Sequence, residues 1–365
     1  MKNSLTEIEK IKKKKDGLDV LSNLYIYAVF GEKVSDGDLE RLKWYGVSQD
    51  KTCEEKDLFR LRIPLENGEL NIEQLKILSE ISKNYANNTL SIAKNQSIRF
   101  HHISICSLPN IFNLLKSVNL TTIFAAGHTV RNVITCPVSD IEHEKIADVT
   151  LLVSKLNDSF KGNKKFSNMP NKLQFAVSGC NESCCSQKPT DVNFNAVEST
   201  KNRVLFSLNI IGQHIGYITS SQVLAVARVI ARVYRDYGNR EDLEKSSFQY
   251  MVEEMGVTKF KDLINGMSNY IIRDFEEIPK KSKALIDHFG INKSNEKNIS
   301  YIGCKTSNYE VGSEGICVLT ELLEKYHASK IKISPLGNLV VLDVPSQNAQ
   351  ELADSLVKSN FNPFI

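Results

Sequence analysis

A gapless internal repeat limits the folds open to this 365-residue chain more than any other sequence feature. The segment around Tyr85 recurs around Tyr326, a constant offset of 241 residues that aligns both helix-like and strand-like stretches. Agreement in both periodicities is hard to reach by chance, so we interpret the repeat as an internal duplication. Two such copies usually pack about a pseudo-two-fold axis. The offset pairs Leu75, Leu78, Ile81, Leu90, Ile92 and Ile98 with Ile316, Leu319, Leu322, Ile331, Ile333 and Leu339.

Each copy has the pattern of a ferredoxin-like unit. In the first copy, 58–64 (LFRLRIP) alternates like a strand and 72–85 has apolar residues at helical spacing. Two further strands are expected within 89–105, followed by a helix over Leu108–Leu120. The order strand, helix, strand, strand, helix is typical of a ferredoxin-like plait.

Between the copies, strand-like runs and an amphipathic helix from Ser220 to about Tyr237 indicate an α/β domain. We therefore predict an α+β protein in which two ferredoxin-like half-domains flank one α/β domain. The expected parts are an N-terminal helical segment at 1–50, the first half-domain at 51–120, the α/β domain at 121–275, a polar linker at 276–298 and the second half-domain at 299–365.

The charge and cysteine content exclude several classes of protein. With 46 basic and 43 acidic residues, the net charge of +3 gives no case for binding nucleic acid or a membrane surface. We expect neither a membrane span nor a secretory signal, since no long apolar run is present. Only one group of the eight cysteines is clustered, so a disulfide framework is not indicated and a reducing cytoplasm fits best.

The clustered cysteines lie in 178–185 (SGCNESCC), after an apolar strand-like run. Cys180 and Cys184 form a C-x3-C pair that could hold one face of a [4Fe–4S] cluster, which normally needs four thiolates. Zinc would also need four ligands, and Cys136 is a remote further candidate. The alternative is a tight loop that contains small, polarizable thiols.

Two segments have arginines suited to an anion. Arg60 and Arg62 share one face of the expected strand at 58–64. Arg131 and Asn132 follow a glycine in 127–132 (GHTVRN), and guanidinium groups bind carboxylates through two parallel hydrogen bonds. Surface ion pairs are the alternative for each segment.

Taken in order, these segments resemble the sirohaem-dependent nitrite/sulfite reductase family, from about Asp16 to the C-terminus. The resemblance identifies 121–275 with the first sirohaem/[4Fe–4S]-type half of that family, between its two ferredoxin-like halves. The matching segments are DGLDVL, DLERLKWYGV, FRLRIP with NGELNIEQL, TVRNVITCPVSD, the strand into SGCNESC, and YRDYGNRED with MGVTKFKDL.

The resemblance implies an oxidoreductase that reduces sulfite to sulfide or nitrite to ammonia by six electrons. It implies sirohaem joined to a [4Fe–4S] cluster through a shared cysteine, with ferredoxin or a flavoprotein as electron donor. By motif position it assigns catalytic roles to Arg62, Arg131 and Lys172, and cofactor binding to Arg60, Asn132 and Gln96. The candidate metal ligands Cys180 and Cys184 come from the C-x3-C spacing alone.

Several positions depart from the family pattern. Asn95 stands where the family has an arginine before its glutamine, and NKLQ at Asn171–Gln174 stands where it has R-K-F-K. His128 replaces an acidic residue, and the glycine-rich loop keeps only Gly212 and Gly216. These changes remove cations from a pocket for a polyanionic cofactor. They also remove glycines that would let the backbone approach the cofactor closely.

The cysteine pattern leaves two hypotheses open. The chain ends where the family would enter its second sirohaem/cluster half, which carries the usual cluster cysteines in C-x5-C and C-x3-C pairs. Cys180 and Cys184 belong to the first half, where they are better interpreted as a symmetry echo of those ligands. One hypothesis is an enzyme whose cluster half comes from a second polypeptide. The other is a cofactor-free structural or regulatory relative. A third reading keeps the redox chemistry but shifts the substrate, as in the cobalamin-pathway relatives of the family.

Overall fold

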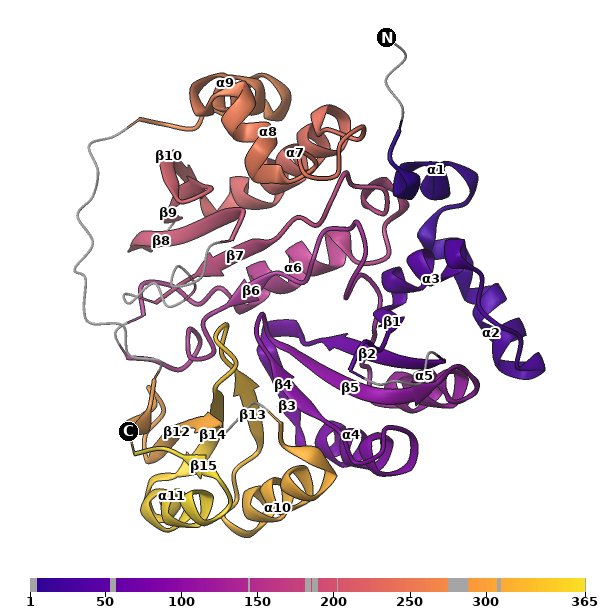
Figure 1. The fold of residues 1–365 in the computed structure, drawn as a ribbon. Coiled ribbons are helices and arrows are strands. Elements are labelled where there is room, and N and C mark those ends of the chain that lie inside the picture. The colour runs from indigo at the N-terminus through magenta and orange to yellow at the C-terminus, as the bar shows by residue number, and fades with distance from the viewer. Residues whose placement is uncertain are drawn as a thin grey trace.

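The described part of the chain builds three β-sheets arranged in two levels (Figure 1). The sheet of the α/β domain lies above, and the two ferredoxin-like half-domains lie side by side below it. This arrangement confirms the predicted α+β fold class. The structure is a computed structural model, and it describes residues 5–52, 57–143, 145–180, 185, 190–201, 203–274, 288–306 and 310–364.

The N-terminal segment forms α1 (Glu7–Lys14), α2 (Leu21–Phe30) and α3 (Asp36–Leu42). The single tryptophan, Trp44, follows these helices and is buried. Its indole N–H donates a hydrogen bond of 2.7 Å to the carbonyl of Ser167. The segment is therefore anchored to the α/β domain by a buried aromatic side chain with a satisfied polar group.

The first half-domain contains a four-stranded sheet in the order β1-β2-β5-β4, with helices α4 and α5. Asn71 and Gln74 form a capping box at the start of α4, and the apolar residues at helical spacing face the core. The bounds are β1 (Val47–Gln49), β2 (Leu58–Pro64), α4 (Ile72–Tyr85), β4 (Ser91–Ala93), β5 (Ser97–Ser104) and α5 (Leu108–Ser117).

The second half-domain repeats this unit around a sheet in the order β11-β12-β14-β13-β3, with β15 also paired to β12. Part of the expected linker, 276–298, lies outside the described residues. The prediction of a linker is wrong for the last part of this segment, because β11 lies there and pairs with β12 as an edge strand. The bounds are β3 (Glu69–Asn71), β11 (Gly290–Lys293), β12 (Ile299–Thr306), α10 (Gly312–Lys325), β13 (Lys330–Ile333), β14 (Leu339–Pro345), α11 (Ala349–Lys358) and β15 (Phe361–Asn362).

Strand pairing confirms the internal duplication. Arg62 pairs with Arg99, and the residues 241 positions later, Gly303 and Val340, pair in the same way. Both sheets also have an irregularity in register at equivalent places, between Phe59 and Leu61 in one and Ser300 and Ile302 in the other. The two copies therefore share their backbone hydrogen-bond pattern as well as their apolar spacing.

The two half-domains exchange backbone contacts and share one hydrophobic core. β3 of the first copy pairs with β13 of the second, including Lys332 with Glu69. The reciprocal bridge joins Ser91 to Glu310, as a pseudo-two-fold axis requires. Helices α4 and α10 pack together, and buried residues of both copies form a single cluster. Neither copy buries its apolar face alone.

The α/β domain has a five-stranded sheet in the order β10-β9-β8-β7-β6, in which β6, β7 and β8 are parallel. The predicted helix at Ser220–Tyr237 is confirmed as α7. None of the described helices is both long and apolar enough to cross a membrane. The bounds are β6 (Ile134–Thr135), α6 (Thr150–Phe160), β7 (Phe175–Ser178), β8 (Val192–Thr200), β9 (Arg203–Ile210), β10 (Gln213–Thr219), α7 (Ser220–Tyr237), α8 (Phe248–Met255) and α9 (Val257–Ser268).

Candidate anion-binding site

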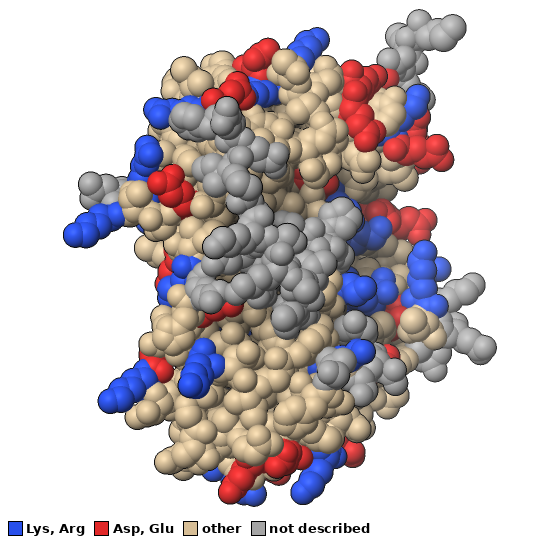
Figure 2. Space-filling model, turned by 90° about the vertical axis from the view of Figure 1, so that its left-hand side faces the viewer, with Lys and Arg blue, Asp and Glu red and all other residues tan. Residues whose placement is uncertain are grey.

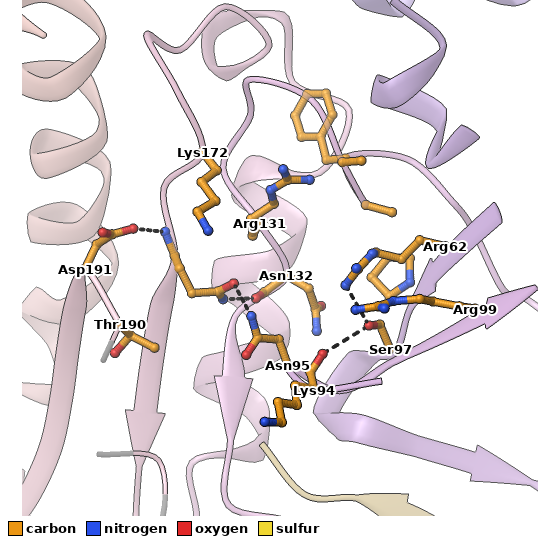
Figure 3. A pocket seen from close by; sticks show the side chains of 15 residues that line it. Arg62, Lys94, Asn95, Ser97, Arg99, Arg131, Asn132, Lys172, Thr190 and Asp191 are labelled. Carbon is orange, nitrogen blue, oxygen red and sulfur yellow. Dashed lines mark hydrogen bonds between the residues drawn. The ribbon is translucent and has the colours of Figure 1, made fainter. Parts of the chain in front are cut away.

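A cavity of about 430 Å³ lies between the first ferredoxin-like sheet and the α/β domain. This volume is within the range of small-molecule binding sites. Figure 3 shows basic side chains that reach the cavity from different sides, and Figure 2 shows basic residues along the right-hand edge, at the level where the upper and lower parts meet. The polar side chains that line the cavity are Arg62, Lys94, Asn95, Ser97, Arg99, Arg131, Asn132, Lys172, Gln174, Thr190 and Asp191.

The sheet contributes Arg62 from β2 and Arg99 from β5, which are direct cross-strand partners. Burial, with the charges of Arg99 and Arg60, lowers the pKa of Arg62 to about 10. Burial, with the charge of Arg60, also lowers the pKa of Arg99. Arg62 donates to the Ser97 hydroxyl at 3.2 Å, whereas Nε of Arg99 is buried with no hydrogen-bond partner. Like charges at opposed strand positions repel each other, so a bound anion would offset the repulsion between these two guanidinium groups.

The loop before β6 contributes Arg131. Gly127 permits the turn, because its φ is 76° and a side chain there would collide with the ring of Trp44. Nη2 of Arg131 donates to the Gly127 carbonyl at 2.9 Å, but Nη1 is buried without a partner. Burial, with the charge of Arg62, lowers the pKa of Arg131 to about 9. The loop therefore holds a desolvated guanidinium near the arginines of the sheet.

His128, at the position of the family's acidic residue, adds no charge to this loop at neutral pH. Burial is the main cause that lowers the pKa of His128 to about 3, and the charge of Lys12 adds to it. Its ring stacks on Trp44 with 6.2 Å between centroids. The neutral imidazole thus packs against the anchor of the N-terminal segment and leaves Arg131 without a carboxylate beside it.

Two amide side chains fasten the cavity wall. Gln174 donates from Nε2 to the Asn132 carbonyl at 2.6 Å, and Asn132 donates from Nδ2 to the Leu65 carbonyl at 2.8 Å. These bonds connect the strand β7 region of the α/β domain to the end of β2. The α/β domain and the sheet arginines are therefore held in one fixed relation across the cavity.

Asp191 is the acidic member of the lining. Its Oδ2 accepts a hydrogen bond of 2.8 Å from the backbone N–H of Gln174. Burial raises the pKa of Asp191 to about 6, although that bond and the nearby charge of Lys172 act in the opposite direction. The cavity therefore combines several cations with one carboxyl group that exchanges its proton near pH 6.

Four of the residues expected at the site come together here: Arg62, Arg131, Lys172 and Asn132 all line the cavity. Arg60 lies on the same strand as Arg62 and acts on its pKa, but it is not part of the cavity lining. Arg99 and Asp191 were not expected from the sequence. The face of Arg99 follows from its cross-strand pairing with Arg62, and the burial of Asp191 follows from tertiary packing.

Gln96 lies outside the cavity, at the junction of the three sheets. Its Nε2 donates to the carbonyls of Thr135 on β6 (3.0 Å) and Ile333 on β13 (2.9 Å). Its Oε1 accepts from the backbone N–H of Thr135 at 2.9 Å. The side chain is fully buried, so its amide serves the packing of the domains.

Cys180 lies in a buried apolar cluster with Cys136 and Cys185, where the α/β domain meets the second half-domain. The Sγ of Cys180 is 3.2 Å from the hydroxyl of Ser178. Cys184 lies outside the described residues. Among the described residues, no group of three or more His, Cys, Asp or Glu side chains is placed to hold a metal ion.

The apolar cluster occupies the place that corresponds to the arginine face of the first copy. Tyr301 and Val340 belong to the cluster, and they lie 241 positions after Arg60 and Arg99. Gly303, the counterpart of Arg62, has no room for a side chain because the His288 carbonyl is in the way. One copy thus presents cations to a cavity, and the other closes the same face with apolar packing.

Comparisons with known proteins agree with this architecture. The family "Nitrite/Sulfite reductase ferredoxin-like half domain" matches residues 54–118, and "Nitrite and sulphite reductase 4Fe-4S domain" matches residues 126–270. The structure of the Mycobacterium tuberculosis NirA protein superposes with a TM-score of 0.91 at 22% identity, covering 99% of this chain and 70% of that one. At this identity the superposition shows the shared fold.

The curated relatives to which this chain is similar are nitrite and sulfite reductases. The assimilatory ferredoxin-dependent nitrite reductase of Haloferax mediterranei is 25% identical, over 88% of this chain and 61% of the relative. The ferredoxin sulfite reductase of Mycobacterium tuberculosis is 24% identical, over 95% of this chain and 67% of the relative. The chain thus spans about three fifths of the length of the first of these relatives.

Fold and cavity together define an α+β protein with duplicated ferredoxin-like half-domains and a cavity lined by cationic side chains. The two matched family segments make up more than half of the chain. The chain belongs to the nitrite/sulfite reductase family, as its motifs predicted.

Proposed function

We propose that this chain binds sirohaem and a small oxyanion, nitrite or sulfite, in the cationic cavity, as a component of an oxidoreductase that reduces the oxyanion by six electrons. The observation that carries the proposal is the convergence of Arg62, Arg99 and Arg131 on one cavity. Apart from burial, the groups that lower the pKa values of these three arginines are other arginines, and no carboxylate acts on them. Such a site favours an anionic occupant.

The residues of the cavity fit a polycarboxylate tetrapyrrole. Nε of Arg99 and Nη1 of Arg131 are buried donors without partners, and carboxylates are their natural acceptors. Sirohaem, when bound there, would supply the redox chemistry for reduction of the oxyanion. Arg131 and Lys172 would bind the oxyanion from the α/β side, while Arg62 and Arg99 face it from the sheet. Their charges would stabilise negative charge as it builds up.

The described residues do not fit a [4Fe–4S] cluster, which normally takes four thiolates. Cys180 is packed among apolar side chains in the described part of the chain. We therefore propose that cysteines outside the described residues, on this or on a second polypeptide, supply the cluster ligands. Ferredoxin is the proposed electron donor, since the curated relatives are described as ferredoxin-dependent enzymes.

Nitrite binding tests the proposed role of the cavity. In isothermal titration calorimetry of chain produced with sirohaem, Arg131→Gln should raise the Kd for nitrite at least about 10-fold, the effect of losing one charged hydrogen bond. The matched control, Arg203→Gln at the exposed start of β9, should leave the Kd unchanged. Equal affinities of the two variants would exclude the cavity as the oxyanion site.

Nitrite titration of the cofactor-free chain, to which the lowered pKa of Arg131 applies, has a predicted pH dependence. The lowered pKa of Arg131, about 9, means that its guanidinium is charged below that pH and loses charge above it. Nitrite remains an anion throughout this range, so its affinity should be constant from pH 7 to about 8 and fall as the pH rises through about 9. The Arg131→Gln variant should not show this fall.

A further inference from the structure

Reduction of an oxyanion in the cavity consumes protons, because each oxygen that is removed leaves as water. The arginines of the lining are poor proton donors near pH 7, since pKa values of about 9 and 10 keep Arg131 and Arg62 charged. Gln174 is a neutral amide whose Nε2 donates to the carbonyls of Asn132 and Phe175. These side chains are therefore suited to binding or positioning a ligand rather than to supplying protons.

Asp191 has the position that a proton donor needs. It lies directly before β8, and its backbone carbonyl accepts a hydrogen bond of 2.9 Å from the N–H of Ile211. The residue is half-buried at the cavity wall, where its Oδ2 accepts the bond from the backbone N–H of Gln174. Backbone groups of two neighbouring segments therefore hold the carboxyl group in place beside the cavity.

The charges around Asp191 leave its carboxyl group able to take up a proton. Among the described residues, Lys172 is the charged group that acts on the pKa of Asp191, and burial outweighs its effect. Tyr234 on α7 stays protonated, because burial and the charge of Asp191 raise its pKa. Figure 3 shows Asp191 and Lys172 across the cavity from the arginines of the sheet. The charged groups that line the cavity from other segments are Arg62, Lys94, Arg99 and Arg131.

A bound oxyanion favours the protonated form of Asp191. Two negative charges in one cavity repel each other, so the carboxylate binds a proton more tightly once the oxyanion is present. An oxyanion that pairs with Lys172 also competes with Asp191 for the charge that stabilises its carboxylate. Binding of the oxyanion is therefore coupled to the uptake of a proton on this side of the cavity.

We propose that Asp191 is the proton carrier of the cavity, taking up a proton as the oxyanion binds and passing it to an oxygen of the oxyanion during reduction. The inference rests on the proposed function, because it needs an oxyanion in this cavity. In the transfer the carboxyl O–H bond breaks and an O–H bond forms on the oxyanion, while the electrons of the reduction come from the proposed ferredoxin donor. The carboxylate that remains takes its next proton from solvent.

Calorimetric titration of the cofactor-free chain with nitrite, in two buffers that differ in ionisation enthalpy, counts the protons taken up. At pH 6.5 the unaltered chain should take up about half a proton per nitrite. Its Kd should fall about 3- to 10-fold from pH 7 to pH 5, since the protonated carboxyl group no longer repels the anion. Asp191→Asn should abolish the proton uptake and bind nitrite at pH 7 about as tightly as the unaltered chain does at pH 5. Asp158→Asn, exposed on α6, is the control and should behave as the unaltered chain does.

Tighter binding after loss of the carboxylate distinguishes this role from a structural one, in which Asp191→Asn would weaken binding at every pH. That weakening would overturn the inference, and so would nitrite binding by the unaltered chain without proton uptake. Urea unfolding at pH 7 checks that the variant is folded, which we expect because the substitution removes a buried charge. If the unaltered chain bound no nitrite, the proposed function itself would fail, so the two failures are distinguishable.

Discussion

Arg62, Arg99 and Arg131 are unfavourably placed in the ligand-free chain, since each is removed from water beside other cations. Proteins keep such arrangements where a ligand compensates for them. At the scale of single residues, the cavity is therefore characterised by cations that have neither water nor a carboxylate to compensate their charge. Arg62 and Arg131 could be recognised from short motifs in the sequence. Arg99 could not, because its role depends on a partner 37 positions earlier that only the strand register brings opposite.

Asp191→Asn should change how the stability of the cofactor-free chain depends on pH. The pKa of Asp191 is raised from 3.8 to about 6, so the native state binds this proton more tightly than the unfolded state. Its contribution to the unfolding free energy is therefore greatest below about pH 4 and is lost as the pH rises through 6. The total change is about 3 kcal/mol. Asp191→Asn should flatten this decline in urea unfolding measured between pH 4 and 7.

The exposed Asp158 on α6 provides a matched control for this experiment. Asp158→Asn should leave the pH dependence of the unfolding free energy as it is in the unaltered chain. Parallel curves for Asp191→Asn and the unaltered chain would show that burial does not perturb Asp191.

Replacing Cys180 and Cys184 by serine should leave the iron content of the purified chain unchanged. Cys180 packs in an apolar cluster in the described structure, and a hydroxyl there should lower the unfolding free energy by about 1–2 kcal/mol. Iron analysis and urea unfolding measure the two effects separately. Loss of iron from the double variant would identify the loop as a ligand after all.

At the scale of elements, local signals located most helices and strands, but the contacts between the copies depend on tertiary structure. The bounds of Ser220–Tyr237 and Ala349–Lys358 agree with the sequence pattern because both helices have a strong apolar stripe. β11 was missed, since a four-residue edge strand gives too little alternation to recognise. The pairing of β3 with β13 has no local signal, because each strand is completed by the other copy.

Gln96 provides a test of how these elements are joined. Gln96→Ala removes three hydrogen bonds and leaves buried backbone groups of Thr135 and Ile333 without partners. The expected loss of unfolding free energy is about 2–4 kcal/mol. Gln350→Ala on the exposed face of α11, where the side chain bonds to Asp354, should change the unfolding free energy by less than about 0.5 kcal/mol. A small effect of Gln96→Ala would contradict its role as the junction.

At the scale of the whole molecule, duplication has produced two similar half-domains with different surfaces toward the α/β domain. The first presents Arg62 and Arg99 to a cavity, and the second presents Tyr301 and Val340 to an apolar junction. The backbone pattern is shared, so side-chain identity alone decides which face can bind an anion. This asymmetry could be predicted only after the register of both sheets was known.

The shared core predicts that the half-domains unfold together. Leu78 on α4 and Leu319 on α10 are equivalent positions and are both fully buried in one cluster. Leu78→Ala and Leu319→Ala should each lower the unfolding free energy by about 2–5 kcal/mol, as cavities in a packed core do. Leu151→Ala, at a position 67% exposed on α6, is the control. Destabilisation of only one half-domain, seen as two separate transitions in urea, would contradict a common core.

The central claim is that the cationic cavity holds sirohaem, and the visible spectrum of the purified chain tests it most directly. The chain should be produced in cells supplied with sirohaem and examined together with its tetrapyrrole content. We expect a coloured protein with about one sirohaem per chain, bound in the cavity opposite the arginine face of the first half-domain. Its spectrum should change when nitrite or sulfite is added. A colourless chain without tetrapyrrole, under conditions that load a known sirohaem enzyme, would contradict the claim and favour a cofactor-free relative.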